Sequence, residues 1–133
     1  MKEHIDTLTD LMLGAAYADK RLEGKELDAI RSMVIKLLGS DTLPGAQEDR
    51  FRSFNPAKHD AKAAAASLAT LSLEHKRKVL ELVATVTDSD DEHDLAEDAY
   101  LRTVAAGLGL GDEELEGMTI EILEEEDLPG FLD

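Results

Sequence analysis

A segment that occurs twice in this chain limits its fold more than any other sequence feature. Residues 19–26 run from an aspartate that ends an apolar helical pattern to a glutamate that opens the next one. Residues 88–97 repeat this arrangement in the second half of the chain. A doubled helix–acidic loop–helix unit sets carboxylates at two comparable interhelical positions. We call these segments the first corner and the second corner, and we look for function there.

Apolar side chains recur at helical spacing through most of the chain, and an alanine-rich stretch adds intrinsic helix propensity. The predicted helices cover residues 6–18, 27–38, 46–53, 57–71, 73–86, 95–108 and 113–118. A chain of 133 residues, 43% of them hydrophobic, suffices for one domain with a modest core. We therefore predict an all-α protein, a single compact bundle of about seven helices built from two helix–acidic loop–helix pseudo-repeats.

The end of the chain differs in composition from the rest. We expect a helical domain over residues 1–118, followed by an acidic C-terminal tail over residues 119–133. The tail is expected to be mobile unless its apolar side chains dock on the helical domain. Those side chains are Leu128, Phe131 and Leu132.

The charge of the chain is strongly negative, with 30 acidic residues against 14 basic ones and a formal net charge of −16. No lysine or arginine lies within residues 81–98 or 112–133, whereas basic residues gather in the stretch 50–78. Nucleic acid is excluded as a partner, because its phosphates would meet a negative field. The charge instead favours a basic protein partner, a divalent cation, or contact between the carboxylates of residues 124–127 and the basic stretch. An ordinary acidic surface that keeps the protein dissolved explains the charge equally well.

The cellular compartment is constrained by what the sequence lacks. The chain has no cysteine, which excludes disulfides and thiolate metal sites. Residues 1–6 lack the apolar core of a signal peptide. No apolar run approaches the ~20 residues that a membrane span needs. We therefore expect a soluble, cytoplasmic protein without membrane insertion.

Several short motifs occur in an order that resembles the tellurite-resistance TerB-like family over roughly residues 5–118. The matching residues are Ala15-Ala16-Tyr17-Ala18-Asp19 with Leu22 and Glu26, then Phe54-Asn55-Pro56-Ala57, the stretch from Leu71 to Arg77, Asp88, Leu95-Ala96-Glu97, and the run from Tyr100 through Leu110. The resemblance implies an all-helical fold of two pseudo-repeats and a non-catalytic interaction module of stress or tellurite-resistance type. It also implies an acidic surface with a metal or cation role, carried by Asp19, Glu26, Asp88 and Glu97.

The chain departs from the family pattern at both corners. The glycine that usually follows the motif aspartate is replaced by Lys20 in the first corner and by Ser89 in the second. Glycine adopts a positive-φ turn freely, whereas lysine and serine do so at a cost. The second corner is also longer than the first. The two corners therefore need not share one geometry.

The second corner is rich in oxygen donors of the kind that Ca²⁺ or Mg²⁺ prefers. The candidate metal ligands of the two corners are Asp19, Glu26, Asp88, Asp90, Asp94 and Glu97. Read as an EF-hand loop that begins at Asp88, the segment has His93 where glycine is needed and Ala99 where the last glutamate ligand belongs. It therefore predicts at best an irregular cation site. The same carboxylates would also stabilise helix N-termini, by roughly 0.3–1 kcal/mol each.

Catalytic motifs are missing from the sequence. No motif pairs a nucleophile with a base, and no glycine-rich phosphate loop precedes a helix. We expect no enzymatic activity, and we expect Tyr17 and Tyr100 beside the corners to be packing residues with solvated hydroxyls. Two functions remain open. One is an interaction module whose acidic corner surface binds a partner, and the other is a divalent-cation-binding protein with its site between Asp88 and Glu97.

Overall fold

The computed structural model describes residues 2–17, 24–55, 57–87, 95–118, 120 and 123–131 of the chain. Over these residues it confirms the all-α class and contains seven α-helices, two short 3-10 helices and no strand. In chain order the elements are η1 (Lys2–His4), α1 (Ile5–Tyr17), α2 (Gly24–Leu38), α3 (Gly45–Ser53), α4 (Ala61–Ala66), α5 (Leu73–Thr87), α6 (Leu95–Gly107), α7 (Asp112–Glu116) and η2 (Glu125–Asp127).

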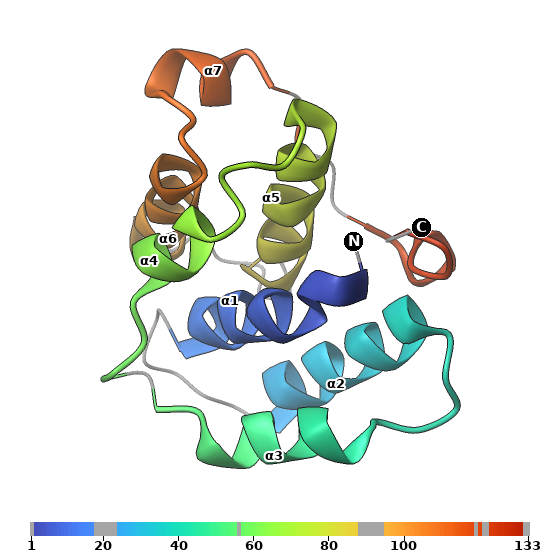
Figure 1. Cartoon of the computed structure of the whole chain (residues 1–133). Helices are drawn as coiled ribbons and strands as arrows, with labels where there is room; N and C mark the ends of the chain where they lie inside the picture. The colour runs from blue at the N-terminus through green and yellow to red at the C-terminus, as the bar shows by residue number, and fades with distance from the viewer. Residues whose placement is uncertain are drawn as a thin grey trace.

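Helix α1 forms the centre of the bundle and packs against α2, α3, α4, α5 and α6. Figure 1 shows α2 and α3 on one side of α1, with α4, α5 and α6 on the other. This position explains why α1 is apolar around most of its circumference. Its largest fully buried side chains are Leu8, Leu11, Met12 and Leu13. Most of the core is therefore organised around a single helix.

A polar network fixes α3 against the start of α1. The buried side chain of Gln47 donates a hydrogen bond of 2.6 Å to Asp6, and Thr9 Oγ1 lies 3.1 Å from the Gln47 amide oxygen. Arg50 bonds Asp10 at 2.8 Å and lies 3.4 Å from Asp6. The hydrogen bond from Gln47 lowers the pKa of Asp6, assisted by the Arg50 guanidinium. These α1 carboxylates therefore serve the packing of α3.

The predicted helix over residues 57–71 is wrong, because the helix in this region is confined to α4. Asn55 forms a turn instead of starting a helix: its carbonyl accepts from Lys58 and His59, and its side chain accepts from Ala57 N. Asp60 is the actual N-cap, with its side chain accepting a 3.0 Å hydrogen bond from Ala63 N. An aspartate at this position satisfies a free helix amide and sets the start of the helix.

The described part of the C-terminal tail contacts α5. Leu128 is 3% exposed within the core, and Leu123 N donates to Thr85 Oγ1 at 2.9 Å. Lys78 Nζ donates to the Phe131 carbonyl at 3.0 Å and lies over the Phe131 ring. The described tail is therefore docked through Leu128 and Phe131, and its contact with the basic stretch joins Phe131 to Lys78. The division of the chain at residue 118 stays a prediction.

Candidate functional site

Both corners connect helices whose ends the structure describes. The first corner begins after Tyr17, the last residue of α1, and ends within the first turn of α2, whose first residue is Gly24. The second corner begins after Thr87, the last residue of α5, and ends within the first turn of α6, whose first residue is Leu95. Four of the six candidate ligands lie outside the described residues: Asp19, Asp88, Asp90 and Asp94.

The remaining two candidate ligands occupy matching places in the fold. Glu26 is the third residue of α2, and Glu97 is the third residue of α6. Their side chains lie outside what the structure describes, so the match concerns the backbone. A carboxylate in the first turn of a helix meets free amides and the positive end of the helix dipole. Both glutamates therefore sit where negative charge is stabilised, as the repeated sequence pattern predicts.

A contact between α1 and α6 holds the end of α1 near the start of α6. Tyr100 on α6 donates a hydrogen bond of 2.8 Å from its hydroxyl to the Leu11 carbonyl on α1. Gly14 makes room for this ring, since a Cβ there would lie 2.2 Å from the Tyr100 hydroxyl. Tyr17 lies about 4.5 Å beyond Gly14 along α1, and Leu95 lies about 7.5 Å from Tyr100 along α6. The end of α1 and the start of α6 are thus each within about two helical turns of one contact.

Four rings build the surface beside this contact. Ring centroids are 5.4 Å apart for Tyr17 and Phe54, 5.1 Å for Phe54 and His59, and 6.3 Å for His59 and Tyr100. His59 Nε2 also lies 3.0 Å from the Tyr100 hydroxyl. Because that hydroxyl donates to the Leu11 carbonyl, its oxygen accepts from a protonated Nε2. The expectation of packing roles for both tyrosines is confirmed, but the solvated hydroxyl predicted for Tyr100 is wrong.

Burial controls the protonation of this ring cluster. It raises the pKa of Tyr100, which keeps the phenol protonated and able to donate. It lowers the pKa of His59 below 6.5, although the negative charges of Asp10 and Asp60 act in the opposite direction. At neutral pH the hydrogen-bonded pair of His59 and Tyr100 is therefore uncharged.

The depressed pKa of His59 predicts a loss of stability in mild acid. The unfolded chain takes up the His59 proton near pH 6.5, whereas the folded chain takes it up at lower pH. This contribution to stability is therefore complete above pH 6.5 and is lost as the pH falls from there toward the folded-state pKa. We expect the melting temperature of the wild type to fall more than that of His59→Gln between pH 7.5 and 5.5. A wild-type protein that gained stability relative to the variant over this range would contradict the assignment.

A shallow pocket of about 530 Å³ opens beside the rings. Gly14, Tyr17, His59 and Tyr100 line it together with the exposed cations Lys58 and Lys62. Among the side chains that the structure describes, no three His, Asp or Glu residues are grouped closely enough to hold a metal ion. The described surroundings of the corners thus contribute aromatic packing, two lysines and the carboxylate of Asp60.

Sequence reasoning missed this ring cluster, although one signal pointed to it. The sequence does not mark His59 as a functional residue, because no second histidine accompanies it at helical spacing. Gly14 interrupts an otherwise apolar helical pattern, and an isolated glycine inside a helix frequently marks a close approach of another element. The structure identifies that element as α6, with Tyr100 and His59 above the glycine.

Comparison with known proteins assigns the chain to a family. No helix in the described parts of the chain is both long and apolar enough to cross a membrane. No curated protein and no solved structure matches the chain. The model of the family described as "Tellurite resistance protein TerB" matches residues 6–119, which is most of the sequence. The chain therefore belongs to the TerB tellurite resistance protein family.

Proposed function

We propose that this chain is a non-catalytic interaction module of stress or tellurite-resistance type that binds a basic protein partner through its corner surface. The observation that carries the proposal is the hydrogen bond between Tyr100 and the Leu11 carbonyl. It holds the end of α1, where the first corner begins, near the start of α6, where the second corner ends. Carboxylates from two distant parts of the sequence can then act on one partner.

The second corner supplies most of the negative charge. Residues 88–97 carry six carboxylates and no lysine or arginine, whereas the first corner balances its carboxylates with Lys20, Arg21 and Lys25. A concentrated negative field attracts a basic surface and accelerates its association. The sharpest test of the proposal therefore concerns the second corner.

A divalent cation is the second candidate ligand, with its site between Asp88 and Glu97. The density of carboxylate oxygens in this segment favours it, because Ca²⁺ takes six to eight oxygen ligands and Mg²⁺ binds through one or two carboxylates with water. Glu97 supports it further, since its backbone is held in the first turn of α6. The bound ion would neutralise part of the repulsion among the carboxylates of this corner.

Melting curves distinguish the two functions. We expect an interaction module to melt at the same temperature in chelator and in millimolar Ca²⁺, Mg²⁺, Mn²⁺ or Zn²⁺ at fixed ionic strength. A cation present at 100 times its dissociation constant would instead add about 2.7 kcal/mol of stability. Asp88→Asn with Asp90→Asn should abolish such a shift, while Asp41→Asn with Asp49→Asn removes equal charge elsewhere and should retain it. An ion-selective shift with this pattern would show that the second corner binds a cation, and cation binding would then replace partner binding as the proposed function.

Partner binding is tested with the same variants by cross-linking the tagged chain in intact cells. The wild type and the Asp41/Asp49 control should capture the same basic protein, and the Asp88/Asp90 variant should lose it. Equal loss in both variants would show that net charge, and not the second corner, governs capture.

A further inference from the structure

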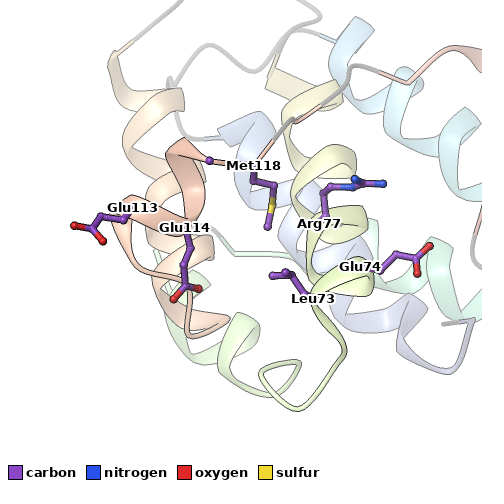
Figure 2. A pocket seen from close by; sticks show the side chains of 7 residues that line it. Leu73, Glu74, Arg77, Glu113, Glu114 and Met118 are labelled. Atoms are coloured by element: carbon purple, nitrogen blue, oxygen red, sulfur yellow. The ribbon is translucent and has the colours of Figure 1, made fainter.

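A groove separates the start of α5 from α7 (Figure 2). It lies at the opposite end of α5 from Thr87, after which the second corner begins. Leu73 and Thr87, the two ends of α5, are about 21 Å apart along the helix axis. The groove has a volume of about 660 Å³, within the range of roughly 300–1,000 Å³ that is usual for ligand sites. Its lining residues are Leu73, Glu74, Arg77, Glu113, Glu114, Gly117 and Met118.

The floor of the groove is apolar. Leu73 is 61% exposed, and among the described residues it is the one large hydrophobic side chain left in solvent. The start of α5 does not depend on the Leu73 side chain, because Ser72 already caps the helix by accepting a hydrogen bond from His75 N at 3.3 Å. Figure 2 shows the Leu73 side chain directed across the groove toward α7 and Met118. A thioether beside an exposed leucine forms a surface that adapts to apolar side chains of different shape.

The rims of the groove are negatively charged. Glu113 and Glu114 lie on the α7 side and Glu74 lies on the α5 side, and Figure 2 shows the carboxylates of Glu113 and Glu74 directed outward from the groove at its two edges. Arg77 is the cation among the lining residues, and its Nε lies 3.7 Å from the buried carboxylate of Glu81. Its charge is therefore partly balanced from within the fold, and the rim retains a net negative charge.

We propose that this groove docks a basic amphipathic segment of a protein partner. Large apolar side chains of the segment cover Leu73 and Met118, and its long lysine or arginine side chains extend over the edges of the groove to the carboxylates of Glu74, Glu113 and Glu114. This is the recognition mode in which an amphipathic helix places its apolar face in a groove. The charge of the rims argues against an acidic segment, and the net charge of −16 on each copy opposes self-association.

No residue in the described part of the tail lines the groove. The described tail residues contact Lys78 and Thr85 farther along α5, and Leu128 is already buried. No corner residue is among those that line the groove, so this inference stands or falls independently of the function proposed for the corners.

Fluorescence anisotropy with a designed peptide tests the docking. The probe is a fluorescein-labelled helical peptide of about 14 residues, with leucines at i, i+4 and i+7 and lysines elsewhere. Leu73→Gln should weaken its binding about tenfold, while the melting temperature stays at the wild-type value because Leu73 is exposed. Glu113→Gln with Glu114→Gln should weaken binding severalfold. Asp41→Asn with Asp49→Asn removes the same charge elsewhere and should stay within about twofold of the wild type.

Methyl NMR locates the peptide directly. Titration should shift the Met118 methyl signal and leave those of the buried Met12 and Met33 in place. The inference is overturned if Leu73→Gln binds like the wild type, or if the Asp41/Asp49 control weakens binding as much as the Glu113/Glu114 variant. A Met118 signal that moves with protein concentration in the absence of peptide would assign the groove to a second copy and also overturn it.

Discussion

Replacing Gly107 by alanine is expected to destabilise the protein by about 1–3 kcal/mol. A Cβ at this position would lie 2.5 Å from the Lys62 carbonyl oxygen and 2.7 Å from the Ala65 Cβ. Both atoms belong to α4, and neither is the end of a flexible side chain that could rotate away. Alanine also favours helix over glycine by up to about 1 kcal/mol, but this gain is reduced at the last residue of α6. Urea denaturation monitored by circular dichroism measures the change in unfolding free energy.

Gly45→Ala is the matched control for this substitution. Gly45 is the exposed first residue of α3, and a Cβ there would meet no atom within 4 Å. Its replacement should therefore leave stability unchanged or raise it by up to about 1 kcal/mol. Equal losses in the two variants would show that α4 and α6 do not pack through Gly107. A loss of stability in the Gly107 variant alone would confirm that α6 packs closely on α4 at this glycine.

The helices of this fold could be predicted where apolar periodicity and burial coincide. α1, α2, α5 and α6 were recovered because each presents a repeating apolar face to the core. The alanine-rich stretch was predicted incorrectly, because intrinsic propensity favours one helix over residues 57–71 and the structure has only α4 there. Short helices in water depend on packing and on caps, so the cap at Asp60 decided where α4 begins.

The contacts around the corners could be predicted from the sequence only in part. The repeated pattern correctly predicted helices with Glu26 and Glu97 in their first turns, because such patterns are local, although α2 and α6 begin two residues earlier, at Gly24 and Leu95. The hydrogen bond from Tyr100 to Leu11 joins residues 89 positions apart, and no local pattern specifies which helices touch. The docking of Leu128 was similarly ambiguous, because a short apolar segment in an acidic tail is compatible with both a mobile and a buried state.

Replacing Leu11 by alanine should have the largest effect of any substitution considered for this chain, a loss of about 2–5 kcal/mol. Leu11 is 0% exposed on the helix that contacts five other α-helices, so its removal leaves a cavity that few neighbours can fill. Domains of this size are stable by roughly 5–15 kcal/mol, so the variant is expected to approach unfolding at physiological temperature. Thermal and urea denaturation measure the loss.

Leu73→Ala is the exposed-site control for Leu11→Ala. The same chemical change at a side chain that is 61% exposed should alter the unfolding free energy by less than about 0.5 kcal/mol. If both variants lose stability equally, Leu73 belongs to the core and the groove between α5 and α7 is closed in solution. If only Leu11→Ala is destabilised, the fold gains little from Leu73. An exposed leucine that contributes so little to folding remains available for binding, which is the role that we propose for the groove.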